Sequence, residues 1–208
     1  MKTNAKMSRT LLFVLGVGLV ALMVRFSVIG KGLPYTYYPD EPDYVASFQR
    51  MFLTQDANPR MFYYPSMLFT LNALAYIPYY TVGRLTGLMH AASDIKGASV
   101  VLMGVGYTPL PSSFLMGRGL TALFGVGAVV MLVVLGRSLT SDWRIGTLAG
   151  LILALSPTHV EYSRYIFPHV ILSFFLLLAF WLSVRVFRKG RWRDYILAGI
   201  GSGLAMST

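Results

Sequence analysis

Long apolar runs constrain this chain more than any other feature of its sequence. They cover residues 11–29, 114–135, 145–155 and 166–187, and a further run begins near Tyr195. A helix needs roughly 20 residues, at about 1.5 Å of rise each, to cross the hydrocarbon core of a bilayer. The third run is short, and it makes a tolerable span in a bundle only if its helix continues through Ser156 and Pro157 to Val160. The pattern predicts an all-α, polytopic membrane helix bundle with about four or five spans.

The composition supports a membrane location. Of the 208 residues, 55% are hydrophobic and only 12% are charged, whereas a soluble domain carries about 25% charged residues. A net charge of +10 can indicate nucleic-acid binding, but here the basic residues cluster at the ends of apolar runs. Membrane proteins place charges in this way beside anionic headgroups. The expected partners are therefore membrane lipids and not nucleic acid.

Basic residues also predict how the chain is threaded. The first run is longer than that of a signal peptide and lacks a small-residue cleavage site, so we expect a retained first span at residues 10–30. Ten of the 18 basic residues lie in three short stretches: Lys2, Lys6 and Arg9; Arg137 and Arg144; Arg185, Arg188, Lys189, Arg191 and Arg193. Short basic loops face the cytoplasm, which predicts a cytoplasmic N-terminus.

The rule that short basic loops face the cytoplasm also predicts where the segment 67–83 lies. This segment is apolar enough to span, but crossing there would put two basic clusters on the outer side. It also contains several tyrosines, which suit an interfacial position. We therefore expect a single transmembrane domain over 1–208, with a long outer loop at 31–113 that holds interfacial helices and the remaining spans at 114–208. Residues 91–113, rich in Gly, Ser and Pro, are expected to form an irregular loop.

Most residues that could carry chemistry fall on the expected outer side. The loop opens with Pro39-Asp40-Glu41-Pro42-Asp43. One of these carboxylates could act as a general base that activates an acceptor hydroxyl, with its neighbour binding a metal or the substrate. Alternatively, Asp40 caps a helix whose first turn contains Glu41 and Asp43, where the helix dipole favours negative charge.

A second group of candidates lies on the outer turn at 156–169. His159, Glu161 and His169 could bind a divalent metal there. The alternative is an interfacial turn in which Glu161 forms an ion pair with Arg164, a contact of small energetic value when exposed.

Arg118 lies where the apolar run 114–135 begins. Its planar guanidinium suits phosphate oxygens, although simple snorkelling toward the interface would also explain its position. The glycines at 117–127 follow no strand, so they do not form a nucleotide-binding fingerprint and are expected to allow close helix packing.

Several short motifs occur together in a fixed order along the chain. They are Pro39-Asp40-Glu41, Phe62-Tyr63-Tyr64-Pro65-Ser66, the stretch 117–125, Leu135-Gly136-Arg137, the stretch 153–157 with His159 and Tyr162-Ser163-Arg164, and Gly203-Leu204-Ala205. In this order, the chain from about residue 11 to 208 resembles the N-terminal part of GT-C glycosyltransferases that use polyprenyl-phosphate sugars. The nearest branch is that of the protein O-mannosyltransferases and aminoarabinose transferases.

The resemblance implies roles for particular residues. Asp40 and Glu41 match the acidic pair that deprotonates the acceptor hydroxyl and organises the site, and Arg118 matches the arginine that contacts the lipid-linked phosphate. Tyr64 and Arg164 are further candidates for substrate binding. Family habit also implies a prokaryotic plasma membrane. The resemblance gives no certain cofactor, and a divalent metal is a possibility.

Two departures from the family pattern bear on function. Members often have an acidic residue after the proline at the position of Pro168, where this chain has His169, which cannot supply the same negative charge. Members are also much longer, so we expect a truncated glycosyltransferase module. The alternative function is a non-catalytic accessory subunit packed in a larger membrane complex. A channel or transporter is disfavoured, because no charged residue lies mid-helix along a plausible path.

Overall fold

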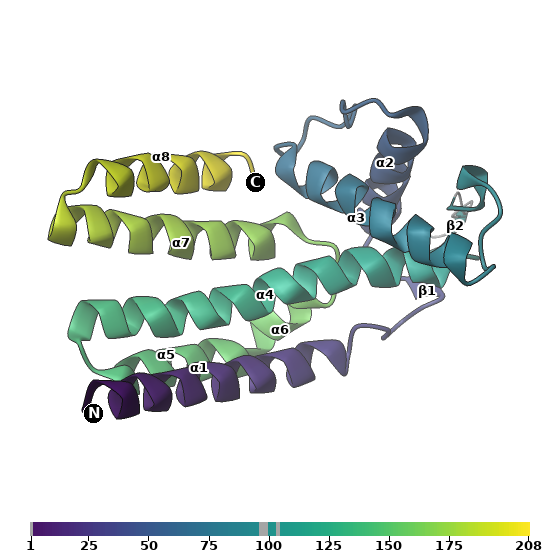
Figure 1. Ribbon diagram of the computed structural model, residues 1–208. Coiled ribbons are helices and arrows are strands. Elements are labelled where there is room, and N and C mark those ends of the chain that lie inside the picture. Colours follow the sequence, from purple (N-terminus) through teal and green to yellow (C-terminus); the bar gives the residue numbers. More distant parts are fainter. Residues whose placement is uncertain (1, 96–99, 103–104) are drawn as a thin grey trace.

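The computed structural model describes residues 2–95, 100–102 and 105–208, which form a helix bundle with a smaller group of elements at one end (Figure 1). The bundle contains α1 (Lys2–Phe26), α4 (Pro111–Thr140), α5 (Trp143–Leu155), α6 (Pro157–Ser163), α7 (Pro168–Lys189) and α8 (Trp192–Met206). We call residues 27–110 the head segment, and the opposite end of the bundle, where the α4–α5 and α7–α8 turns lie, the turn end. Side chains of residues 2–10, with the basic residues Lys2, Lys6 and Arg9, lie outside the description.

Helices α4 and α7 are long and apolar enough to cross a membrane. The apolar part of α1 (residues 11–26) and α5 are shorter apolar helices. The expected apolar runs therefore do become helices, although the number of spans stays a prediction.

The expected continuation of the third run through to Val160 is wrong. Helix α5 stops at Leu155, and α6 starts anew at Pro157. Ser156 between them has an extended backbone, with ψ of 117°, because the residue before a proline is pushed out of the helical region. The break turns the chain and points α6 toward the head segment.

The head segment is not purely helical, which corrects the all-α expectation. It contains α2 (Glu41–Thr54), α3 (Met67–Leu85), a short 3-10 helix η1 (Ala92–Ile95) and the strands β1 (Tyr35–Thr36), β2 (Val100–Leu102) and β3 (Val105–Tyr107). The strands form an antiparallel sheet in the order β1-β3-β2, with Tyr35 opposite Tyr107. Part of the expected irregular loop thus pairs with the chain that leaves α1. Residues 96–99 and 103–104 of that loop lie outside the described residues.

Helix α3 lies beside the start of α4 and alongside α2, away from the parallel helices of the bundle (Figure 1). Several of its apolar side chains are exposed, among them Leu74, Ile77 and Val82. These side chains are suited to a membrane interface, so an interfacial position for α3 stays our prediction.

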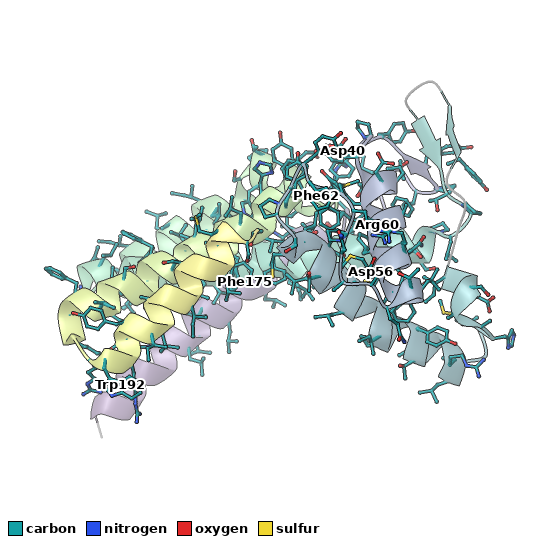
Figure 2. The ribbon with its side chains drawn as sticks, turned by 90° about the horizontal axis from the view of Figure 1, so that it is seen from above. Asp40, Asp56, Arg60, Phe62, Phe175 and Trp192 are labelled. Atoms are coloured by element: carbon teal, nitrogen blue, oxygen red, sulfur yellow. The ribbon has the colours of Figure 1, made fainter. Side chains whose placement is uncertain are left out.

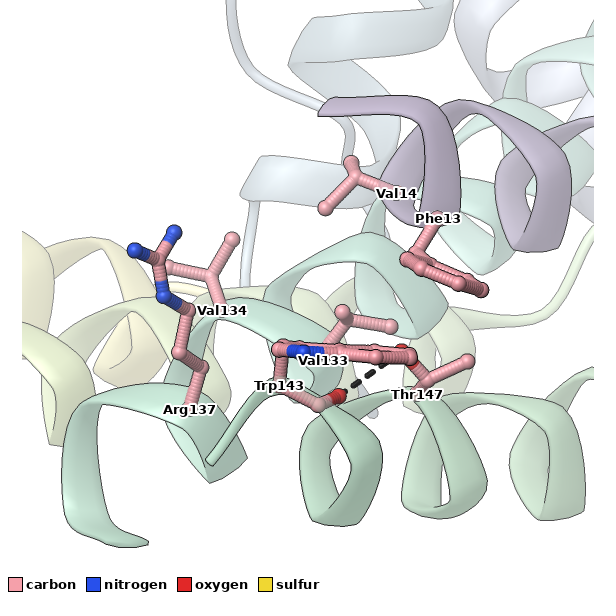
Figure 3. A pocket seen from close by; sticks show the side chains of 7 residues that line it. All are labelled: Phe13, Val14, Val133, Val134, Arg137, Trp143 and Thr147. Carbon is pink, nitrogen blue, oxygen red and sulfur yellow. Dashed lines mark hydrogen bonds between the residues drawn. The ribbon is translucent and has the colours of Figure 1, made fainter. Parts of the chain in front are cut away.

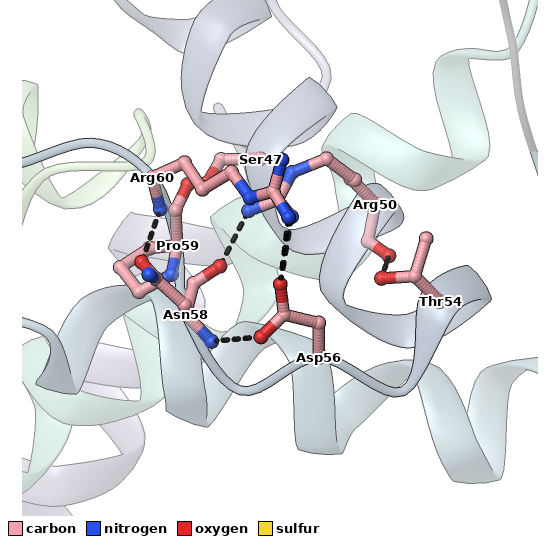
Figure 4. Close-up of polar contacts among 7 residues, drawn as sticks. All are labelled: Ser47, Arg50, Thr54, Asp56, Asn58, Pro59 and Arg60. Atoms are coloured by element: carbon pink, nitrogen blue, oxygen red, sulfur yellow. Dashed lines mark hydrogen bonds and ion pairs between the residues drawn. The ribbon is translucent and has the colours of Figure 1, made fainter.

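A short turn after α2 is held by charged side chains (Figure 4). Asp56 forms ion pairs with Arg50, at 3.5 Å, and with Arg60, at 3.4 Å. The backbone N–H of Asn58, and then the two arginines, lower the pKa of Asp56. These contacts fix the turn from which the chain runs on to Tyr64.

Glycines allow close packing within the bundle, as predicted for residues 117–127. A Cβ at Gly125 would come within 2.7 Å of Ser163 Oγ and 2.9 Å of Arg25 Nε, and one at Gly127 within 2.9 Å of the Phe174 ring. Close packing is tightest between α4 and α5, where a Cβ at Gly146 would lie 2.4 Å from the carbonyl oxygen of Val133. Small residues of this kind let membrane helices approach each other.

Candidate functional site

Glu41 and Arg118 form a buried ion pair where the head segment meets the bundle. Arg118 Nη2 lies 2.7 Å from Glu41 Oε2, and Arg118 Nε donates to Glu41 Oε1 at 3.0 Å. Neither side chain is exposed by more than 1%. A burial this complete excludes snorkelling as the explanation for Arg118.

Arg118 also uses both N–H groups of its Nη1. Its Nη1 donates to the carbonyl oxygens of Ile29 and Lys31, both at 3.1 Å. Glu41 Oε1 accepts a further bond from the backbone N–H of Ile166 at 2.8 Å. The pair therefore joins the end of α1, the start of α2, α4 and the segment after α6. Both charges are neutralised within the protein.

Asp40 is placed differently from its neighbour. Its carboxylate is partly exposed and accepts one hydrogen bond, from the Tyr44 hydroxyl at 3.4 Å. Asp40 occupies the N-cap position of α2, but its side chain makes no capping hydrogen bond. Helix capping therefore does not explain why a carboxylate stands at this position. Of the two adjacent carboxylates, Glu41 is buried and Asp40 is partly exposed to solvent.

Aromatic rings surround Asp40. Tyr44 packs edge-on against Tyr64, with ring centroids 5.9 Å apart, and Tyr38 stacks on Tyr165 at 5.7 Å. Burial, followed by the charge of Asp40, raises the pKa of Tyr38 to about 12. Burial also raises the pKa of Tyr44. Both phenols therefore stay protonated beside the carboxylate and can act as hydrogen-bond donors.

Aromatic residues of α6 and of the segment after it extend this group of rings. We call the whole group the aromatic wall: Tyr38, Tyr44, Phe62, Tyr64, Tyr162, Tyr165, Phe167 and His169. Phe167 stacks on Tyr162 at 4.7 Å and on His169 at 4.6 Å, and His169 also meets the edge of Tyr64. Figure 2 shows that Asp40 and Phe62 lie near each other where the head segment adjoins the bundle. Phe62 is 81% exposed, so the aromatic surface around Asp40 is open on this side.

Arg164 lies next to this wall. It forms an ion pair with Glu161, as the alternative interpretation of the turn predicted, and its Nη2 donates to the Tyr165 hydroxyl at 2.8 Å. Its guanidinium also lies over the Tyr165 ring, 4.8 Å from the centroid. Its Nε is buried and has no partner among the described residues.

The structure does not bring the candidate metal ligands His159, Glu161 and His169 together. Glu161 is held by Arg164, His169 packs among aromatic rings, and His159 Nδ1 accepts a bond from Arg25 Nη2 at 2.8 Å. Within the described part of the chain, no three His, Cys, Asp or Glu side chains lie together as metal ligands would. His159 and Glu161 lie two positions apart on α6 and therefore point in different directions, whereas His169 lies on α7.

Arg25 is the buried residue that the sequence reasoning missed. Its side chain is 0% exposed. Its Nη1 donates to the carbonyl oxygens of Ala21 and Ala154, at 3.1 and 3.3 Å, and its Nε lies 3.3 Å from Ser163 Oγ. Its Nη2 reaches His159 and, at 3.5 Å, the carbonyl oxygen of Leu153.

The position of Arg25 explains why it tolerates burial without a carboxylate. The carbonyls of Leu153 and Ala154 belong to the last turn of α5, where the helix dipole is negative. All five N–H groups of the guanidinium find acceptors. The signal in the sequence was an arginine inside an apolar run, a feature that deserves a functional or structural explanation by default.

Comparison with known families gives one match. Residues 99–208 match the family of dolichyl-phosphate-mannose-protein mannosyltransferases. This region covers α4 to α8, with Arg118, Arg164 and the wall residues Tyr162, Tyr165, Phe167 and His169, whereas Asp40, Glu41 and the other wall residues precede it. A search of curated proteins and a search of solved structures each found no match. Because the matched region is more than half of the chain, the chain belongs to the dolichyl-phosphate-mannose-protein mannosyltransferase family, a group of membrane glycosyltransferases of the GT-C type.

Proposed function

We propose that this chain transfers a sugar from a polyprenyl phosphate to an acceptor hydroxyl, with Asp40 as the general base. The observation that carries the proposal is the contrast between two adjacent carboxylates. Glu41 is buried and neutralised by Arg118, whereas Asp40 is partly exposed and is held by Tyr44. An ionised carboxylate with an open side is what a base requires.

The reaction needs a base on one side and a cation on the other. Asp40 takes the proton of the acceptor hydroxyl as its oxygen bonds to the anomeric carbon of the sugar. The bond from that carbon to the phosphate oxygen breaks, and the lipid phosphate leaves. A guanidinium near the departing phosphate stabilises the charge that develops there.

Arg164 is better placed than Arg118 for the phosphate. Four of the five N–H groups of Arg118 are bonded to Glu41, Ile29 and Lys31, and its side chain is 1% exposed. The Arg164 side chain is 12% exposed, and its Nε is unpartnered among the described residues. Tyr165 connects Arg164 to Tyr38 and so to the surroundings of Asp40. Arg118 then contributes by fixing Glu41 and the start of α2, and Tyr64 contributes to the aromatic wall beside the substrate.

A transfer assay with a matched pair of variants tests the base. Membranes that contain the chain are supplied with dolichyl phosphate carrying radiolabelled mannose, and label released from the lipid is measured. Asp40→Asn should abolish transfer. Asp43→Asn removes an exposed carboxylate three positions away on α2 and should leave transfer unchanged.

Two results would contradict the proposal. Equal rates for both variants would remove Asp40 as the base. Absence of transfer by the unaltered chain, together with stable copurification of other membrane proteins, would instead support an accessory subunit.

A further inference from the structure

The turn end of the bundle carries a strong excess of positive charge. Its cations come from the α4–α5 and α7–α8 turns: Arg137, Arg144, Arg185, Arg188, Lys189, Arg191 and Arg193. Arg188 Nη2 lies 3.4 Å from the carbonyl oxygen of Leu139, so the two turns are in contact.

Carboxylates at this end are few and already engaged. Asp142 caps α5 by accepting from the backbone N–H of Arg144 at 2.9 Å. Asp194 is buried and accepts from Arg185 Nη2 at 2.6 Å. Seven cations thus face two carboxylates, of which Asp194 is already paired with Arg185, so this end attracts anions.

Two of the three tryptophans, Trp143 and Trp192, begin α5 and α8 at the turn end, and Trp181 lies on α7 about two turns before that end. Each has an arginine over its ring: Arg144 over Trp143 at 5.7 Å, Arg185 over Trp181 at 5.0 Å and Arg193 over Trp192 at 5.6 Å. Tryptophan concentrates at the level of lipid headgroups, where one edge is wet and the rest of the ring is in an apolar surrounding. The turn end therefore matches a headgroup layer in both charge and ring chemistry.

A narrow cleft opens at this end between α1, α4 and α5 (Figure 3). The rings of Phe13 and Trp143 stack in it at 3.9 Å, and Val14, Val133 and Val134 supply further apolar walls. The Thr147 hydroxyl is turned to the Trp143 carbonyl at 2.8 Å. Arg137, exposed to solvent, rises beside Val134 at the side of the cleft. An apolar cleft with a cation at its rim matches a molecule with a hydrocarbon tail and a negative head.

We propose that this cleft binds one anionic phospholipid, with its phosphate on Arg137 and the first part of an acyl chain against the Phe13 and Trp143 rings. A zwitterionic phospholipid offers the same tail, but its choline cation would meet the positive surface of the turn end, so the site discriminates in favour of net negative lipids. The site lies at the turn end, and Figure 2 shows that Asp40 is far from Trp192, which begins α8 at that end. The inference is therefore independent of the proposed transfer reaction.

Native mass spectrometry of the purified chain in mild detergent tests the site. The chain is mixed with dioleoyl phosphatidylglycerol or with dioleoyl phosphatidylcholine, and bound lipids are counted. We expect the first bound phosphatidylglycerol to be retained about fivefold more strongly than phosphatidylcholine, as one well-placed cation near an anionic headgroup provides. Arg137→Gln should abolish that preference.

A matched variant separates a site from diffuse attraction. Arg193→Gln removes the same charge from the same end, but on α8, which does not line the cleft, and it should keep the preference. Equal loss in both variants would overturn the proposal in favour of general surface charge. Complete displacement of the lipid by inorganic phosphate would also overturn it, because the tail would then contribute nothing.

Val134→Trp, which fills the cleft while all cations remain, should reduce binding of the lipid tail. Unchanged lipid binding by this variant would contradict the assignment to this cleft.

Discussion

Arg118 holds Glu41 by two contacts, of 2.7 and 3.0 Å, across 77 positions of sequence. The same carboxylate accepts the backbone N–H of Ile166. Three segments that are distant in the sequence therefore meet on one side chain. This arrangement fixes the first turn of α2 and, with it, the adjacent Asp40.

Removing the charge of Glu41 should destabilise the protein strongly. Glu41→Gln leaves the Arg118 cation buried without a counter-charge, a situation that costs about 3–5 kcal/mol of unfolding free energy. The effect is measured by reversible unfolding in detergent micelles.

Glu161→Gln is the control for this prediction. It removes the carboxylate of an ion pair in which Glu161 is 51% exposed, and an exposed pair contributes at most about 1 kcal/mol. Equal losses from the two substitutions would show that the Glu41 contact is no stronger than a surface pair.

The sequence could identify this pair of acidic residues but not divide their roles. Asp40 and Glu41 are neighbours, so any local pattern treats them alike. Their difference arises because Arg118, from α4, reaches Glu41 only in the folded chain. From the sequence alone, Arg118 fitted both snorkelling and phosphate binding. The structure excludes snorkelling, because Arg118 is a buried partner of Glu41.

Helices α4 and α7 could be predicted from the sequence, because their apolar runs are long enough to cross a membrane. The sheet was not, because strands such as β1 have two residues and depend on a partner about 70 positions away, as in the Tyr35 and Tyr107 pair. Such short strands carry no periodicity to detect. The break at Ser156 was missed although Pro157 signals it, because the length needed for a span was given more weight than the proline.

Arg25 should be irreplaceable even by lysine. Lysine offers three donors in place of five, so at least two of the acceptors around Arg25 lose their bond. With about 1.5–3 kcal/mol for each hydrogen bond to a charged group, Arg25→Lys should cost about 3–6 kcal/mol of unfolding free energy. Thermal unfolding of the purified chain in detergent measures the change.

Arg144→Lys is the matched control for Arg25→Lys. Arg144 is exposed at the turn end, and its substitution should change stability by less than about 0.5 kcal/mol. A small effect at both positions would mean that the contacts of Arg25 are dispensable.

His159 should make stability depend on pH. Burial, followed by the charge of Arg25, lowers the pKa of His159 to about 4, from 6.5. Between these values the unfolded chain binds a proton that the folded chain does not, so stability falls as pH falls from about 6.5 to about 4 and is fully present above that window. His159→Gln should flatten the melting temperature over this range. His90→Gln, at an exposed position, should leave the slope intact, and an unaltered slope in both variants would assign it to other groups.

Gly146 should not accept a side chain. A Cβ at this position would lie 2.4 Å from the Val133 carbonyl oxygen and 2.9 Å from the Arg137 backbone nitrogen. These are backbone atoms of α4, which cannot rotate away as a side-chain tip can, so the two helices must move apart. Gly146→Ala should therefore cost about 1–3 kcal/mol of unfolding free energy, the usual range for overpacking.

Gly199→Ala is the matched control, because it adds the same methyl group to α8 at a position where nothing lies within 4 Å. It should be neutral or stabilising, because alanine favours the helix by about 1 kcal/mol over glycine. Unfolding of both variants in the same detergent decides the matter: similar stabilities would show that α4 and α5 are not held in direct backbone contact.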